Sequence, residues 1–168
     1  GVALEAGSVT RFTFGDVAAI GGLTDFVSRI YPSVSGRGQM VYGNKNWSTQ
    51  IEGVGTDYEE MRNAGPVVGR FFSEEELRNR DKVVLLGPTV ARQLFGEANP
   101  VGEMVKINFI NFQVIGVLPS KGVAGFRDQD DTVIMPVTTA MYRLLGKQYI
   151  DSIAVEVKDL AVADQAQE

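Results

Sequence analysis

Apolar and polar residues alternate over several segments of the chain, and this pattern predicts strands. The run KVVLLG at 82–87 is almost continuously apolar, as in a strand that is buried on both faces. Two strand-like runs, 39–42 and 47–54, flank the turn-forming residues 43–46 and predict a hairpin. Further strands are predicted at TVIMP (132–136) and SIAVEV (152–157).

A second hairpin is predicted over 102–118 from a change in the parity of the apolar positions. Apolar residues occupy odd positions up to Phe109 and even positions from Ile110 onward. Because successive side chains of a strand point to opposite faces, such a switch indicates that the chain reverses at 108–111.

Helices are predicted where a hydroxyl residue is followed three positions later by an acidic one, which is the capping-box pattern. This pattern occurs at Thr13, Thr56 and Ser73. A further helix is predicted to begin at Pro88, which suits a first helical turn, and to end at Gly96. Helical character is also predicted for TTAMYRLLG (138–146) and from position 159 onward.

The order of these elements predicts an α+β fold with a mixed or antiparallel sheet, divided into two lobes. Residues 1–9 are small and polar and are expected to be a flexible lead-in. The glycine-bearing loop at 119–131 is long enough to be functional or mobile. The helix predicted from Asp159 has nothing after it to pack against, so we expect the chain to be a fragment of a larger protein.

Composition narrows the chemistry that the chain could carry. Its 16 basic and 21 acidic residues give a net charge of -5, and the scattered basic residues argue against a nucleic-acid partner. The sequence has no histidine and no cysteine, which excludes Ser-His and Cys-His nucleophiles and cysteine-held zinc. No apolar run reaches the roughly 18 residues that span a bilayer. Carboxylate chemistry, Ser-Lys chemistry, hard-cation binding or no chemistry remain.

Three aspartates, Asp128, Asp130 and Asp131, are the strongest candidates for chemistry. On an extended segment the first two would point to one side and the third to the other, which leaves a paired-carboxylate hydrolase open. A calcium loop is disfavoured because no acidic residue closes the D-x-D pattern. The favoured interpretation is a solvated loop that closes onto the strand at 132–135, with the acids capping nearby amides. We therefore expect no catalytic, cofactor-binding or metal-binding residue.

Two other candidates are weaker. Ser120 and Lys121 are adjacent, not spaced as in the S-x-x-K pattern of Ser-Lys enzymes. Trp47 on its predicted hairpin is typical of packing or of a ligand platform. With Tyr42 or Tyr58 it could serve a stand-alone ligand-binding module, which would be a different class of protein from either an enzyme or a transporter part.

Four segments, taken in order, give the chain a specific resemblance. They contain G-R-F-F, L-G-x-T-V-A-x-x-L-F-G, N-P-V-G and D-Q-D-D. Over residues 13–158 the chain resembles the periplasmic core domain of MacB-like ABC transporter permeases. The resemblance implies two lobes: a discontinuous porter-like βαβ lobe at 1–54 and 132–168, and a smaller mixed α/β lobe inserted at 55–131.

The resemblance also implies a function. The chain would be the extracytoplasmic, periplasmic domain of a permease in the bacterial inner membrane, with no catalysis or cofactor of its own. It would transmit ATP-driven conformational change for efflux or extraction of substrates, while a separate cytoplasmic domain hydrolyses ATP. The implied partners are a second permease copy, the ATP-binding domain or subunit and a membrane-fusion adaptor, with no nucleic acid. A stand-alone ligand-binding module is the alternative.

Overall fold

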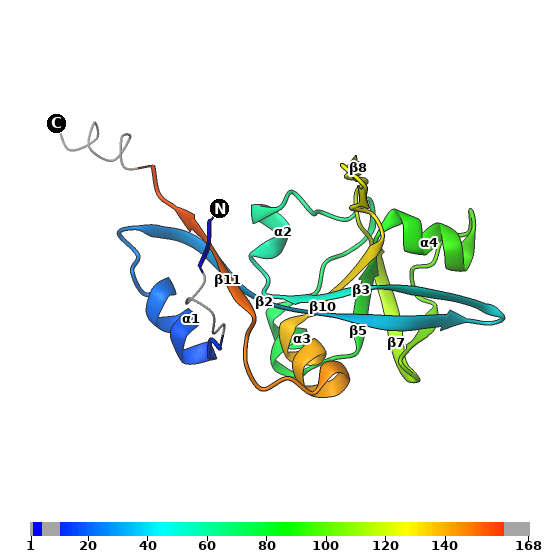
Figure 1. Ribbon diagram of the computed structural model, residues 1–168, viewed down its shortest axis with the longest axis horizontal. Helices are drawn as coiled ribbons and strands as arrows, with labels where there is room; N and C mark the ends of the chain where they lie inside the picture. The colour runs from blue at the N-terminus through cyan, green and yellow to red at the C-terminus, as the bar shows by residue number, and fades with distance from the viewer. Residues whose placement is uncertain (1, 5–10, 160–168) are drawn as a thin grey trace.

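One mixed sheet carries most of the chain. The computed structural model describes residues 2–4 and 11–159, and in these residues nine strands form one sheet (Figure 1). Its order is β1-β11-β2-β3-β10-β5-β7-β4, and β6 pairs with both β2 and β7. The strands are β1 (Val2–Leu4), β2 (Val27–Tyr42), β3 (Lys45–Val54), β4 (Val68–Gly69), β5 (Val83–Leu86), β6 (Met104–Ile107), β7 (Ile110–Val117), β10 (Thr132–Pro136) and β11 (Ser152–Val157). The predicted α+β fold with a mixed sheet is confirmed.

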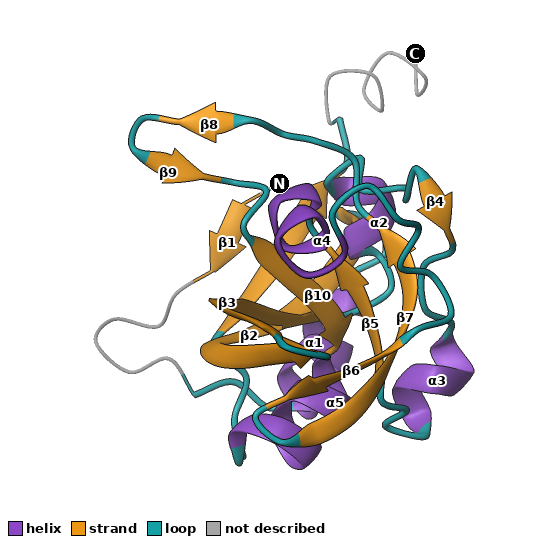
Figure 2. Ribbon diagram, turned by 90° about the vertical axis from the view of Figure 1, so that its right-hand side faces the viewer, coloured by secondary structure: helices purple, strands orange, loops and turns teal. Residues whose placement is uncertain are grey.

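Two hairpins organise this sheet, and both were predicted. The longer one joins β2 to β3 through Gly43 and Asn44, so its turn is shorter than the predicted 43–46. The second joins β6 to β7 through Asn108 and Phe109, where the parity of the apolar positions changes. A third, separate hairpin of β8 (Val123–Ala124) and β9 (Arg127–Asp128) projects from the sheet (Figure 2).

Short helices connect the strands. Capping boxes begin α1 at Thr13 and α3 at Ser73, as predicted. The box predicted at Thr56 is wrong, because the Thr56 hydroxyl hydrogen-bonds Glu74 and the N-cap of α2 is Asp57, whose side chain makes no capping bond. The helices are α1 (Phe14–Gly21), α2 (Tyr58–Met61), α3 (Glu74–Arg78), α4 (Pro88–Phe95), α5 (Val137–Thr139) and a π-helical continuation, η1 (Ala140–Leu145).

The first strand corrects the prediction of a flexible lead-in for residues 2–4, while the rest of that prediction, residues 1 and 5–9, lies outside the described residues. Val2–Leu4 form β1, which pairs antiparallel with β11 between Ile153 and Val155. Without β1, the outer edge of β11 would present unpaired backbone groups, and pairing satisfies them. The helix predicted to start at Asp159 lies outside the described residues.

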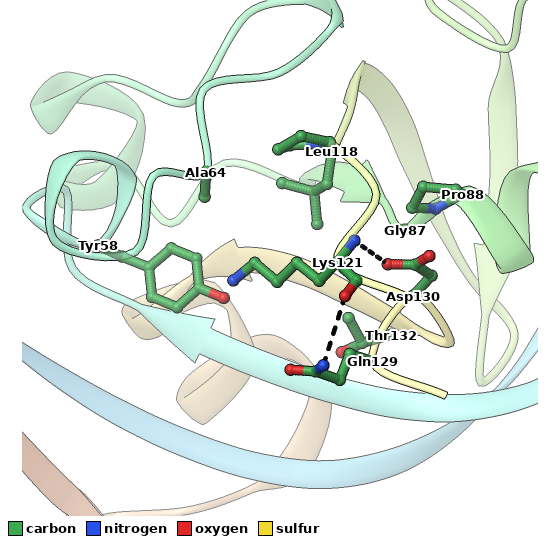
Figure 3. Close-up of a pocket in the computed structure, with 10 residues that line it drawn as sticks. Tyr58, Ala64, Gly87, Pro88, Leu118, Lys121, Gln129, Asp130 and Thr132 are labelled. Carbon is green, nitrogen blue, oxygen red and sulfur yellow. Dashed lines mark hydrogen bonds between the residues drawn. The ribbon is translucent and has the colours of Figure 1, made fainter. Parts of the chain in front are cut away.

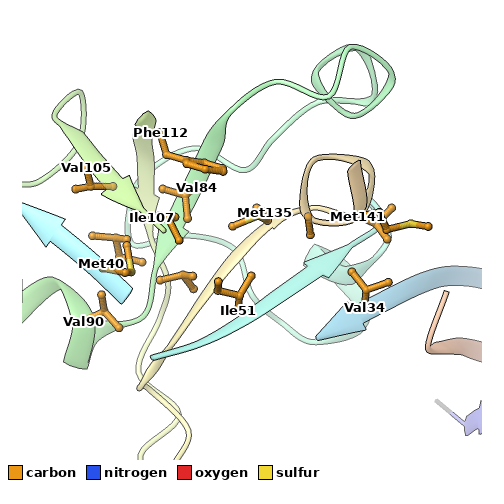
Figure 4. Packing of buried hydrophobic residues seen from close by; sticks show 14 of the residues in the cluster. Val34, Met40, Ile51, Val84, Val90, Val105, Ile107, Phe112, Met135 and Met141 are labelled. Atoms are coloured by element: carbon orange, nitrogen blue, oxygen red, sulfur yellow. The ribbon is translucent and has the colours of Figure 1, made fainter. Parts of the chain in front are cut away.

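The two faces of β3 have different surroundings. Thr49, Ile51 and Gly53 are buried on one face, where Ile51 belongs to the main hydrophobic cluster (Figure 4). Gln50 and Glu52, on the opposite face, are only half-buried. The neighbouring strands repeat this division, with Val34 of β2 and Val133 of β10 in the main cluster, so the other face of the sheet is free to carry a polar surface.

A second hydrophobic cluster lies further along the polar face. It includes Tyr31, Val54, Tyr58, Phe71 and Ile134. Strands β10 and β5 pair across the predicted lobe boundary, and the main cluster also draws on both sides of it. The division into lobes therefore stays a prediction.

Gly53 fixes how closely α5 and η1 approach the sheet. A Cβ atom at Gly53 would lie 2.4 Å from Ala140 Cβ and 3.1 Å from Val137 Cα. We expect Gly53→Ala to lower the free energy of unfolding by about 1–3 kcal/mol, because backbone must shift to admit the methyl group. Urea unfolding followed by Trp47 fluorescence measures this. Gly65→Ala is the control, since its nearest atom would be 3.9 Å away, and equal effects would contradict the packing argument.

Candidate functional site

The loop at 119–131 is held to the sheet by its aspartates. Asp131 accepts hydrogen bonds through Oδ1 from Trp47 Nε1 at 2.9 Å and from Thr49 Oγ1 at 2.7 Å. Both donors lie on β3, and Thr49 is fully buried. Asp131 thus ties the C-terminal end of the loop to the central hairpin.

Asp130 closes the loop on itself. It is 7% exposed, and its carboxylate accepts a hydrogen bond from the Lys121 amide at 2.7 Å (Figure 3). It also accepts from Ser120 Oγ at 2.7 Å and from the Gly122 amide at 3.3 Å. Burial alone would raise the pKa of Asp130, but these hydrogen bonds favour the carboxylate and hold its pKa below the ordinary value. The predicted role of capping nearby amides is confirmed for this residue, although its side chain is buried and not solvated.

Asp128 connects the loop to a helix. Its Oδ2 accepts from Thr89 Oγ1 of α4 at 2.6 Å, and its Oδ1 accepts from the Asp130 amide at 2.9 Å. Each of the three carboxylates, Asp128, Asp130 and Asp131, therefore accepts hydrogen bonds from a different set of donors. These contacts support the structural interpretation over a shared carboxylate pair; that the chain has no catalytic residue stays a prediction.

A polar groove lies on the open face of the sheet beside this loop. Its volume is about 340 Å³, within the range of pockets that hold small ligands. The floor comes from β2, β3, β10 and β11, one wall from α2 and its C-cap, and the other wall from the loop and β9. The lining residues are Ser33, Ser35, Gln50, Glu52, Tyr58, Arg62, Lys121, Arg127, Gln129, Thr132, Asp151 and Ser152.

Lys121 lies where this groove meets a smaller cavity. Figure 3 shows its side chain reaching toward Tyr58, and Nζ lies 5.7 Å from the centre of that ring. The smaller cavity, lined by Tyr58, Gly87, Asp130 and their neighbours, has a volume of about 20 Å³, enough for about one water molecule. A ligand larger than a water molecule that contacts Lys121 must therefore occupy the groove and not this cavity.

Two ionisable groups of the groove, Glu52 and Lys121, have pKa values shifted toward their uncharged forms. Burial raises the pKa of Glu52 above its ordinary value, and the positive charges of Arg62, Lys121 and Arg127 oppose this shift without cancelling it. Burial lowers the pKa of Lys121, and the charge of Arg62 lowers it further. The folded protein thus disfavours both the ionised carboxyl of Glu52 and the charged amine of Lys121.

The aromatic residues predicted as a ligand platform are engaged elsewhere. Trp47 is half-buried and donates to Asp131. Tyr42 packs on Phe95 with ring centroids 4.2 Å apart, and Tyr58 is buried in the second hydrophobic cluster. The three rings do not form a common exposed surface, so they give the ligand-platform hypothesis no support.

Sequence reasoning singled out Tyr58 and Lys121 but missed most of the groove, including Glu52, Arg62 and Arg127. A signal existed for Glu52, because Gln50 and Glu52 occupy successive positions on one face of a strand whose other face is buried. No local pattern marks Arg62 or Arg127. Each is an exposed basic residue next to a turn, and only the folded chain brings the two to one groove.

Solved structures with the same fold come from ABC-type transporters. The periplasmic region of MacB from Actinobacillus actinomycetemcomitans superposes with a TM-score of 0.78 at 24% identity, covering 95% of this chain and 72% of that one. The extracellular domain of the noncanonic ABC-type transporter YknZ from Gram-positive bacteria has a TM-score of 0.77 at 20% identity, covering 94% of this chain and 78% of that one. The fold is therefore one used by extracytoplasmic transporter domains.

The family is identified by sequence. The family of MacB-like periplasmic core domains matches residues 2–168, and the chain belongs to it. It is 52% identical over 168 residues to the macrolide export ATP-binding/permease protein MacB of Bdellovibrio bacteriovorus, covering 100% of this chain and 26% of that protein. It is 57% identical over 163 residues to the protein of the same name from Chlorobaculum tepidum, covering 95% and 25% respectively. The predicted resemblance is confirmed, and the chain spans about a quarter of the length of these curated relatives.

We expect Asp131→Ala to lower the free energy of unfolding by about 1–3 kcal/mol. The substitution leaves the buried Thr49 hydroxyl and the Trp47 indole without the acceptor that they share. Urea unfolding of the variant beside Asp25→Ala, which removes an exposed carboxylate, measures the difference. If the two variants lose the same stability, Asp131 does not anchor the loop.

We expect Glu52→Gln to raise the melting temperature at pH 7. The folded state raises the pKa of Glu52 above the ordinary value of 4.5, so its stabilising contribution is complete below that pH and is lost as the pH rises through the folded pKa. The advantage of the variant over the parent should therefore shrink toward pH 4. Thermal unfolding at several pH values tests this, with the exposed Glu97→Gln as control. A lower melting temperature at pH 7 would contradict it.

Proposed function

We propose that this chain is the periplasmic domain of an export-type ABC permease of the bacterial inner membrane, and that it transmits motion and docks partners without catalysing a reaction. Its family and the names of its relatives, which are macrolide export ATP-binding/permease proteins, support this proposal. None of the helices in the described part of the chain is long and apolar enough to cross a membrane. Other parts of such a permease would supply the membrane spans and the ATP-hydrolysing domain.

The observation that carries the proposal is the position of the first and last strands. β1 and β11 are neighbours, with Val2 opposite Val155, and they lie at one end of the sheet. From β11 the sheet continues into the β2–β3 hairpin, whose tip at Gly43 lies at the far end of the molecule (Figure 1). Because a close-packed body transmits displacement with little deformation, movement of β1 and β11 would carry the hairpin tip with it.

The proposed partners are those that membership of the family implies. A second permease copy would stand beside the first, an ATP-binding domain or subunit would drive the movement, and a membrane-fusion adaptor would dock away from the membrane. The division into a porter-like lobe (1–54 and 132–168) and an inserted lobe (55–131) is retained in the proposal.

Spin labels test rigid-body transmission in the complete gene product in membranes. The chain has no cysteine, so Lys45→Cys at the hairpin tip and Lys158→Cys after β11 place labels at the two ends of the domain. Doubly labelled copies are diluted in unlabelled ones, so that only the distance between the two labels of one copy is measured. We expect this distance to be the same without nucleotide and with a trapped ATP analogue. With Lys45→Cys alone, the distance between the two copies should change.

Two outcomes would contradict the proposal. The distance within one copy could change as much as the distance between copies, in which case the domain deforms and does not transmit. Alternatively, nucleotide could leave the distance between copies unchanged, in which case the domain is not coupled to ATP. A label pair at Lys45 of β3 and Lys106 of β6 controls for local changes at the hairpin tip.

A further inference from the structure

Three basic side chains line the polar groove without ion-pair partners. Arg62 follows α2 on one wall and Arg127 lies on β9 in the other, while Lys121 extends from the loop toward Tyr58 of α2. Among the described residues, the ion pairs within 4 Å join other groups, and none includes these three. Arg62 uses Nε to donate to Tyr31 Oη at 2.9 Å, which leaves its terminal nitrogens available.

Two of the three cations, Arg62 and Lys121, are close enough to interact unfavourably. The charge of Arg62 adds to burial in lowering the pKa of Lys121. The carboxylate of Glu52 attracts all three cations but makes no ion pair with any of them. Asp151, the other acid of the groove, is already bonded to Lys147 at 2.6 Å and to the Ser35 amide at 3.0 Å. A negative group between the walls would relieve the repulsion between the cations.

The floor of the groove supplies neutral hydrogen-bonding groups. Gln50 and Gln129 contribute side-chain amides. The hydroxyls of Thr132 and Ser152 line the same space, where Thr132 Oγ1 already donates to the Gln50 carbonyl at 3.2 Å and Ser152 Oγ shares a hydrogen bond with Ser33 Oγ at 2.6 Å. Basic side chains combined with neutral donors are the groups that bind tetrahedral oxyanions, in which every oxygen accepts. The volume of about 340 Å³ admits a phosphate together with the group that bears it.

We propose that this groove binds a phosphate-bearing ligand, with the anionic group held between Arg62, Lys121 and Arg127. The ligand is a phosphorylated small solute or the head group of an anionic lipid, and both offer the same oxyanion. The proposal rests on the groove alone and does not depend on the transport role.

Glu52 sets the pH dependence of this binding. It lies on the floor, where the charges of Arg62, Lys121 and Arg127 act on it and where its own charge acts on Tyr31 and Tyr58, with Asp151 and Lys147 at the β11 end. When ionised, it competes with the ligand for the cations. Anion binding should therefore strengthen as the pH falls and Glu52 takes up a proton.

Titration with sodium sulfate at constant ionic strength tests the site. Sulfate is a tetrahedral oxyanion that keeps its charge from pH 4 to pH 8. In ¹H–¹⁵N spectra of the 168-residue chain, we expect saturable shifts confined to the amides around Gln50, Lys121 and Gln129. The apparent dissociation constant should fall as the pH is lowered.

Charge variants of opposite sign sharpen the test. Lys121→Gln and Arg127→Gln should each weaken sulfate binding about threefold to tenfold. Glu52→Gln should strengthen it and remove most of its pH dependence. Lys45→Gln, which removes an exposed charge at the far hairpin tip, is the matched control and should leave binding unchanged.

Several results would overturn the proposal. Shifts spread over all basic residues, or equal weakening in Lys45→Gln and Lys121→Gln, would indicate ionic screening and no site. Weaker binding in Glu52→Gln would mean that the groove prefers a ligand with a positive group. If sulfate binds as expected, phosphatidylglycerol vesicles identify the source. If the parent binds these vesicles and Arg127→Gln does not, the ligand is a lipid head group. If the parent does not bind the vesicles, the ligand is a soluble phosphate.

Discussion

The parallel pairing of β10 with β3 is the interaction on which the rest of the structure depends. It joins Thr132–Pro136 to Gln50–Val54, two segments that are far apart in the sequence. The pairing brings the chain back after the 119–131 loop and places Asp131 against Trp47 and Thr49. The same pairing places the 119–131 loop beside the open face of β3. The groove exists because this return occurs next to a strand with a polar face.

The groove does not contribute to stability in the way that the main cluster does. A buried apolar face stabilises the sheet, whereas Glu52 is ionised at a cost and Arg62 and Lys121 repel each other. Unfavourable charges of this kind are typical of sites that are completed by a ligand or partner. The structural aspartates behave differently, because each hydrogen-bonds donors that would otherwise be unsatisfied.

Local patterns in the sequence predicted the local structure well. The capping boxes at Thr13 and Ser73, the reversal near Asn108 and the buried strand at 83–86 follow from contacts between residues close in sequence. Thr56 fails because a distant residue, Glu74, takes its hydroxyl. The groove could not be predicted for the same reason, since its walls come from α2 and from β9 and meet only in the folded chain. The family resemblance predicted the fold class, because it depends on the order of several segments together.

The strands at the two edges of the sheet affect how copies of this chain interact with one another. The described sheet begins at β1 and finishes at β4, strands of three and two residues. Strands this short offer few backbone groups to a neighbouring molecule. Of the long strands, β3 pairs with β10 only over residues 50–54, so residues 45–49 pair with β2 alone, and the charge of Lys45 opposes pairing between molecules there. Edge-to-edge growth of the sheet into aggregates is therefore discouraged. A protein crowded beside its own copies can keep an extended hairpin because short end strands and a charged tip disfavour cross-molecular pairing.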